Sequence, residues 1–219
     1  MKRVNSDDKI KAIIFDIVGV MNIGGKKRKS PAQVHTSGVH EHIANKLKMS
    51  MDNYFDAIDS AYAKSIEGKI SKSVLTGVLA CNLNYPKDKI EKLYAQAYKK
   101  KYKLNKGLIK IAKDLQKQGY KIAILSDQWH FSSDVLIPKK EFAFIKKKVI
   151  SCDVGMRKPN KQIYELALKK LGVEADEAVF IDDQEWNIVP AHKLGLNTIL
   201  FIDNKKTKEQ LKHFGIHLK

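Results

Sequence analysis

The sequence predicts an α/β fold in which a doubly wound parallel sheet carries a small all-helical insert. Three short apolar runs, at 12–15, 121–125 and 178–181, have the length and composition of buried strands. Segments with the apolar spacing of helices alternate with the later runs, which implies parallel strands joined by right-handed crossovers. Between about residues 34 and 104 only helical spacing occurs. We therefore expect a core domain of residues 1–21 and 104–219, with a helical domain at 22–103.

The insert begins with a Gly-rich, basic loop at 22–31, whose residues 26–29 we interpret as a solvated turn and not as a nuclear-localisation patch. Four helices are expected after it. The residues that predict them are Ile43, Leu47 and Met51, spaced by four; Tyr54 to Tyr62; Val74 to Val78, after a capping Ser71; and Ile90 to Tyr98.

The second part of the core is expected to continue in the order helix, strand, helix. Its predicted helices are 108–115, 163–171 and 188–194, each followed by a glycine that can end it. Its predicted strands are 121–125, 149–150, 178–181 and 198–202.

The composition is strongly basic, with 41 Lys and Arg against 24 Asp and Glu and a net charge of +17. Such a charge favours anionic partners, nucleic acid among them. However, aromatic residues do not alternate with the lysines, so we interpret them as a solvated exterior and do not expect nucleic-acid binding. Two distant cysteines, a polar N-terminus and the lack of a membrane-span-length apolar run predict a cytoplasmic protein without a membrane partner.

Polar residues follow the predicted strands. They are Asp16, Ser126, Lys158 and the pair Asp182 and Asp183. Any one has an ordinary explanation; Asp16 alone fits a helix cap or a turn equally well. Together they are expected at one rim, because ligands of open α/β sheets bind at the carboxyl ends of the strands. Carboxylates there can hold Mg²⁺ or attack phosphorus, while Lys158 and Ser126 can stabilise a phosphoryl group.

Four segments resemble the motifs of the haloacid dehalogenase superfamily, in order and spacing. They are Phe15-Asp-Ile-Val-Gly19, Leu125-Ser-Asp127, Gly155-Met-Arg-Lys-Pro159 and Phe180-Ile-Asp-Asp-Gln-Glu-Trp-Asn187. The resemblance covers about residues 11–204. It implies a Rossmann-like core and a helical cap inserted after the first motif.

By this resemblance the chain is a Mg²⁺-dependent phosphatase-type hydrolase of a small phosphorylated compound, as a monomer or homodimer. Asp16 would be the nucleophile, with Lys158 in the catalytic site. The phosphate or substrate would bind Ser126, Asp127 and Lys158. The metal would bind Asp16, Asp182, Asp183 and the backbone carbonyl of Val18.

The chain departs from the family at Val18, where phosphatases usually carry a second Asp that acts as general acid and base. Losing such a group typically costs about 10²–10⁴ in rate. Dehalogenases, phosphonate-cleaving enzymes and cation-pumping ATPases of the superfamily also lack it, but dehalogenases lack the paired acids seen here at Asp182 and Asp183. His35, His40 or His42 could supply a substitute acid, although clustered histidines are more often solvated. The alternative is a catalytically impaired protein that binds a phosphorylated or acidic partner.

Overall fold

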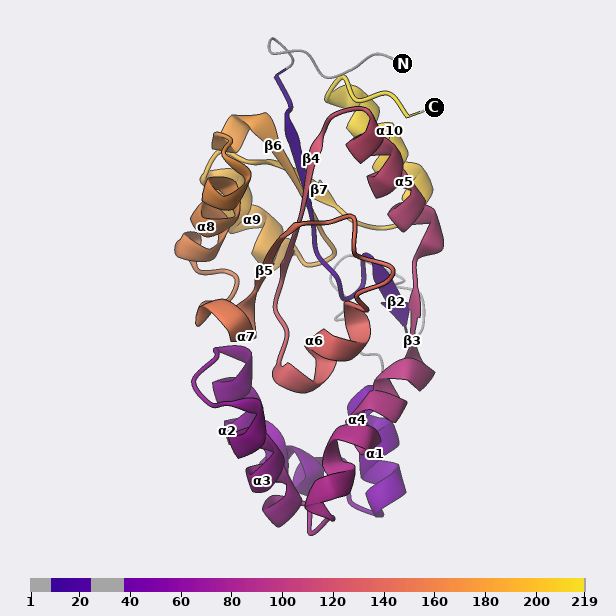
Figure 1. The fold of residues 1–219 in the computed structure, drawn as a ribbon, viewed down its shortest axis with the longest axis vertical. Helices are drawn as coiled ribbons and strands as arrows, with labels where there is room; N and C mark the ends of the chain where they lie inside the picture. Colours follow the sequence, from indigo (N-terminus) through magenta and orange to yellow (C-terminus); the bar gives the residue numbers. More distant parts are fainter. Residues whose placement is uncertain (1–8, 25–37, 219) are drawn as a thin grey trace.

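The computed structural model describes residues 9–24 and 38–218, which form a five-stranded parallel sheet flanked by helices and a helical cap beyond one end of the sheet (Figure 1). The strand order is β5-β4-β1-β6-β7, so the first strand of the chain lies in the middle. The strands are β1 (Ala12–Phe15), β4 (Lys121–Ser126), β5 (Lys147–Ile150), β6 (Ala178–Asp182) and β7 (Asn197–Leu200). This is the predicted doubly wound α/β fold.

Alternate residues of the strands bury the two faces of the sheet. On one face, Ile13, Phe15 and Ile124 share a core with α5 (Lys106–Lys117) and α10 (Asn204–His213). On the other, Ile14 and Phe180 pack with α8 (Lys161–Leu171) and α9 (Glu185–Lys193). Figure 1 shows these two helical layers on the right and left of the sheet. The period of two in the strands therefore places successive residues in different cores.

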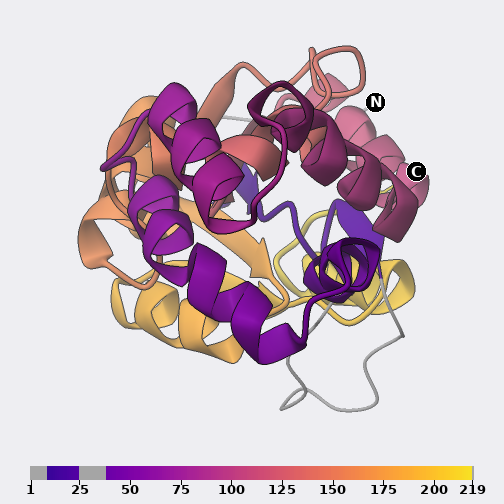
Figure 2. The same cartoon turned by 90° about the horizontal axis from the view of Figure 1, so that it is seen from below.

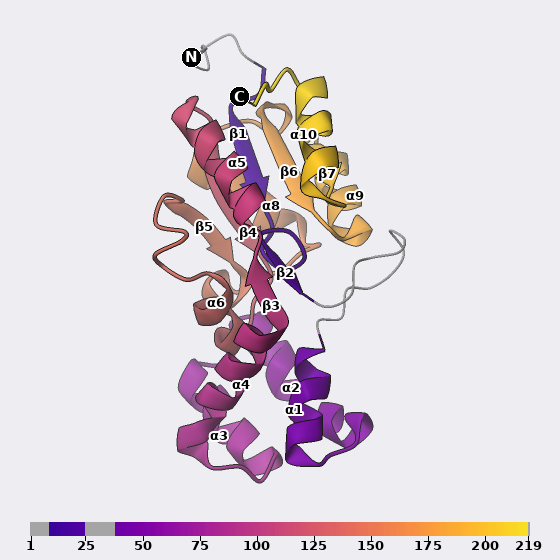
Figure 3. The same cartoon turned by 90° about the vertical axis from the view of Figure 1, so that its right-hand side faces the viewer.

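The cap consists of α1 (Val39–Leu47), α2 (Met51–Ile66), α3 (Lys72–Asn82) and α4 (Lys87–Lys101), seen from below in Figure 2. A two-stranded antiparallel ribbon, β2 (Asn22–Gly24) with β3 (Tyr102–Leu104), connects it to the sheet. In the side view of Figure 3 the cap lies beyond the carboxyl end of β4. The ends of the strands that carry the polar residues thus face the cap.

Several local predictions were wrong. Residues 22–24 were predicted as loop and residues 102–104 as part of the helical region, but both are strands. They flank the cap in the sequence and pair with each other where the cap joins the core. Met51 belongs to α2 and not to the helix of Ile43. The chain leaves α1 at Lys48 with φ 56°, and the Ser50 hydroxyl accepts a hydrogen bond from the Asn53 backbone to begin α2. The last strand ends at Leu200, two residues before its predicted end at residue 202.

Four elements in the described part of the core were not predicted. Three are short, α6 (His130–Leu136), α7 (Ser151–Val154) and a 3₁₀ helix (Ala175–Glu177), and the fourth is the ten-residue helix α10, which Asp203 begins by accepting a hydrogen bond from the Lys206 backbone. The basic stretch 26–29 and His35 lie outside the described residues. Among the described helices, none combines the length and apolarity that crossing a bilayer requires.

Candidate active site

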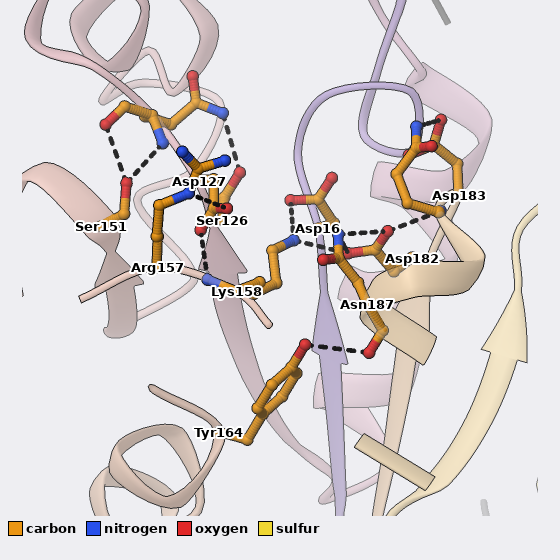
Figure 4. Close-up of polar contacts among 12 residues, drawn as sticks. Asp16, Ser126, Asp127, Ser151, Arg157, Lys158, Tyr164, Asp182, Asp183 and Asn187 are labelled. Atoms are coloured by element: carbon orange, nitrogen blue, oxygen red, sulfur yellow. Dashed lines mark hydrogen bonds and ion pairs between the residues drawn. The ribbon is translucent and has the colours of Figure 1, made fainter. Parts of the chain in front are cut away.

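Asp16 follows β1 in the middle of the sheet, where its neighbours come from both adjacent strands. Its backbone N–H donates to the Ile181 carbonyl of β6 at 2.9 Å, which fixes it beside Asp182, the last residue of that strand. Ser126 ends β4 on the other side and is fully buried. Figure 4 shows Asp16, Asp182 and Lys158 converging at this end of the sheet. The structure therefore brings together residues that lie far apart in the sequence.

Lys158 bridges two of the acids. Its Nζ lies 3.0 Å from Oδ1 of Asp16 and 2.6 Å from Oδ2 of Asp182, with the lysine side chain only 2% exposed. Burial disfavours the charge of Lys158, but Asp16, Asp182 and Asp127 outweigh it and raise the lysine pKa above its ordinary value. Burial raises the pKa of Asp16 to about 6, although Lys158 acts in the opposite direction. Lys158 is therefore a fixed positive charge in this site.

The acids form a set that fits a hard divalent cation. Asp16, Asp182 and Asp183 are all buried, and one carboxylate oxygen from each lies within 4.8 Å of the others. Three carboxylates against one ammonium group leave net negative charge, and oxygen donors are what Mg²⁺ prefers. Asp183 lies against the turn after β1. Gly19 there has φ 84°, and a Cβ on it would lie 2.3 Å from Oδ2 of Asp183.

Two residues without a predicted role orient the paired acids. The Asn187 amide lies 3.2 Å and 3.1 Å from the two oxygens of Asp182, and Gln184 donates from its backbone to Asp182 and from its side chain to Asp183. The Tyr164 hydroxyl in turn donates to the Asn187 carbonyl at 3.0 Å. The only sequence signal for Asn187 was its place at the end of the fourth motif, one helical turn beyond the acids.

The loop after β4 is also ordered by hydrogen bonds. Ser126 hydrogen-bonds with Asp16, which lowers the pKa of that acid, and accepts from the Gln128 side-chain amide at 2.9 Å. Asp127 accepts from the Lys158 backbone N–H at 3.0 Å and lies 3.6 Å from Arg157 Nε. The carboxylate of Asp127 thus holds the lysine loop in place. Its predicted contact with substrate stays a prediction.

A cavity of about 580 Å³ opens between these residues and the cap. Asp16, Asp183 and Lys158 line its floor together with Val18, which is half-buried. The predicted metal contact of the Val18 carbonyl stays a prediction. His40, one of the candidate substitute acids, also lines the cavity. Burial lowers its pKa to about 4, so the imidazole is neutral at pH 7.

Residues 10–195 match the haloacid dehalogenase-like hydrolase family. The chain belongs to this family.

Individual relatives differ in activity. The chain is similar to bifunctional epoxide hydrolase 2 of Rattus norvegicus, with 26% identity over 92% of this chain and 38% of that protein. It is similar to glyceraldehyde 3-phosphate phosphatase of Methanocaldococcus jannaschii, with 28% identity over 44% of this chain and 43% of that one. It therefore spans less than half of either relative.

A similar solved structure is a haloacid dehalogenase family enzyme of Bacteroides thetaiotaomicron in complex with magnesium and inorganic phosphate. The identity is 17% and the TM-score 0.68, over 87% of this chain and 93% of that one. This likeness establishes a common fold.

Proposed function

We propose that the chain is a Mg²⁺-dependent phosphohydrolase that acts on a small phosphorylated compound through an aspartyl-phosphate on Asp16. The observation that carries the proposal is the convergence of Asp16, Asp182 and Asp183 within 4.8 Å, with Lys158 bridging two of them at the floor of a cavity. The Bacteroides relative with magnesium and phosphate and the archaeal phosphatase support this choice of chemistry.

In the proposed reaction an oxygen of Asp16 bonds to phosphorus while the bond from phosphorus to the leaving-group oxygen breaks. Lys158, held by Asp16 and Asp182, offsets charge on the phosphoryl oxygens, and Ser126 can donate a hydrogen bond to one of them. A Mg²⁺ ion bound by Asp16, Asp182 and Asp183 would supply further positive charge there. Water then attacks phosphorus, inorganic phosphate leaves, and the Asp16 carboxylate is restored.

Val18 limits which leaving groups this reaction can expel. Its isopropyl group on the cavity wall can neither protonate a leaving group nor activate water. The leaving oxygen must therefore take its proton from solvent. We expect esters of acidic alcohols and acyl phosphates to react, and ordinary alkyl esters to react about 10²–10⁴-fold more slowly than with an acid present. The same residue favours the second candidate function, an impaired enzyme that binds a phosphorylated partner.

Hydrolysis of acetyl phosphate tests the proposal. We expect the wild type to release phosphate with Mg²⁺ and to stop with a chelator, and we expect Asp16→Asn to be inactive. Asp134→Asn is the matched control, since Asp134 is an exposed acid of α6 that pairs with Lys72. Equal rates in wild type and Asp16→Asn would refute the proposal. No release by any variant would favour the binding function.

A further inference from the structure

The lining of the cavity is rich in aromatic rings. His40, Phe55, Tyr62 and Tyr98 come from the cap helices α1, α2 and α4, and Trp129 comes from the loop after β4. Tyr102 of β3 and Trp186 of α9 complete the set, which we call the aromatic wall. The proposed phosphoryl site and this wall belong to one cavity. A substrate bound with its phosphate beside Asp16 would therefore place its leaving group against these rings.

Four rings of the aromatic wall contact one another. The Tyr62 and Trp129 ring centroids lie 4.9 Å apart, and His40 lies 5.7 to 6.2 Å from Phe55, Tyr62 and Trp129. Trp129 is buried, whereas Phe55 and Trp186 are 39% and 52% exposed. Exposed aromatic side chains beside a cavity are available to a ligand, and ring-to-ring contacts add to the burial of apolar area.

The charges of the described residues around the aromatic wall do not favour a second anionic group on the leaving group. The cap carries many lysines, yet within its described part no lysine lines the cavity. Its charged lining residue is Glu41, which would repel an anion. His40 is neutral at pH 7 because burial lowers its pKa to about 4. Arg157 of the core also lines the cavity, but its guanidinium faces Asp127 at 3.6 Å.

We propose that the substrate is a phosphate monoester with an uncharged, apolar, ring-bearing leaving group, which binds against the aromatic wall. Phosphorylated sugars, hydroxy acids and compounds with a second phosphate are expected to bind less well, because the rings of the wall are uncharged at pH 7 and Arg157, the described cation that lines the cavity besides Lys158, already faces Asp127. This inference rests on the proposed function and names the substrate class for the same site.

Binding of phosphonates tests the class without relying on turnover, because their carbon–phosphorus bond is not hydrolysed. The probes are butylphosphonate, 4-phenylbutylphosphonate and 4-carboxybutylphosphonate, titrated by calorimetry into the wild type with Mg²⁺. We expect the phenyl compound to bind about tenfold more tightly than the butyl compound, since a buried ring removes apolar surface from water. The carboxylate compound should bind no more tightly than the butyl compound.

Two variants test whether the tighter binding of the phenyl compound depends on the aromatic wall. Phe55→Ala should weaken the binding of the phenyl compound several-fold more than the binding of butylphosphonate. Val78→Ala is the control, because Val78 is exposed to the same extent on another cap helix, 38% against 39% for Phe55. It should leave both affinities unchanged.

Equal affinity of the phenyl and butyl compounds, tighter binding of the carboxylate compound, or no binding of any phosphonate would overturn the proposed substrate class. The acetyl phosphate assay is the separate test of the phosphohydrolase function. Hydrolysis of acetyl phosphate together with any of these results would mean that the reaction is right and the substrate class wrong.

Discussion

The indole Nε1–H of Trp129 donates a hydrogen bond to the Tyr98 hydroxyl at 2.7 Å, and both side chains are buried. Trp129 belongs to the loop that carries Ser126 and Asp127, and Tyr98 belongs to cap helix α4. The next residue, His130, lies 3.0 Å through Nε2 from the Ile70 carbonyl of the cap. The segment after β4 is therefore hydrogen-bonded to the cap at two places.

Tyr98→Phe is expected to destabilise the protein by about 1–3 kcal/mol, because the buried Trp129 N–H loses its acceptor. Denaturant unfolding gives the free energy of unfolding. Tyr85→Phe is the control, since Tyr85 is half-buried in the same cap. A Tyr98→Phe protein as stable as the control would mean that this bond does not hold the cap to the core.

Mg²⁺ should raise the melting temperature of the wild type and much less that of Asp182→Asn. Asp182 is completely buried and contributes one of the three converging carboxylates, so the change to Asn removes a negative charge and one of its two ligand oxygens. Asp134→Asn alters a side chain that is 71% exposed, so its melting temperature should rise with Mg²⁺ as much as that of the wild type. If Asp182→Asn and Asp134→Asn gain equally from Mg²⁺, Asp182 is not a metal ligand.

Asn187→Ala is expected to weaken Mg²⁺ about 10–100-fold without touching a ligand itself. The Asn187 amide contacts both oxygens of Asp182, and groups that orient metal ligands have effects of this size. Calorimetric titration measures the affinity. In Asn82→Ala, which removes an exposed amide of α3 that donates to the Ala57 carbonyl, the affinity should not change. Identical affinities in the two variants would show that Asn187 has no orienting role.

His40 is expected to make the stability fall between about pH 6.5 and pH 4. Burial lowers its pKa from 6.5 to about 4, so over this range the unfolded chain binds a proton that the folded protein does not. Acidification therefore favours unfolding. His40→Gln should show a shallower loss of unfolding free energy over the same range. His192→Gln, at an exposed site on α9, should retain the steeper wild-type profile, and a steep profile in His40→Gln would contradict this account.

The sheet and the acids were predictable because each depends on local sequence. The run at 12–15 is apolar at every position, as a strand buried on both faces requires, and Asp16 follows it at once. The antiparallel ribbon was not predictable, because residues 22–24 and 102–104 are short, partly exposed and far apart in the sequence. Pairing of this kind leaves no periodic signal.

The contacts that complete the site could not be predicted either, because they also join residues that lie far apart in the sequence. Gln128 and Trp129 look like ordinary loop residues, yet one holds Ser126 and the other reaches the cap. The aromatic wall draws on three cap helices, the ribbon strand β3 and two parts of the core, so no single segment shows it. Of its residues only His40 was named from the sequence as a candidate site residue, and its burial among rings could not be read from its sequence neighbours.

Val18→Asp is expected to raise the turnover of ordinary phosphate monoesters, up to about the 10²–10⁴-fold of general acid–base catalysis. Val18 lines the cavity beside Asp16, so an acid there has access to the leaving group. Steady-state rates of phosphate release measure the gain. Val18→Asn, which is close in size to Asp but cannot give up a proton, should add nothing. Equal rates in the two variants would argue against this role for an acid at residue 18.

The central claim is that Asp16 becomes phosphorylated, and mass spectrometry of the acid-quenched protein tests it most directly. The wild type is mixed with acetyl phosphate and Mg²⁺, quenched and digested. We predict one added phosphoryl group on the peptide that contains Asp16, with a lifetime that Val18→Asp shortens, and no such group in Asp16→Asn. The absence of any adduct on that peptide in both the wild type and Val18→Asp, or an adduct that persists in Asp16→Asn, would contradict the claim.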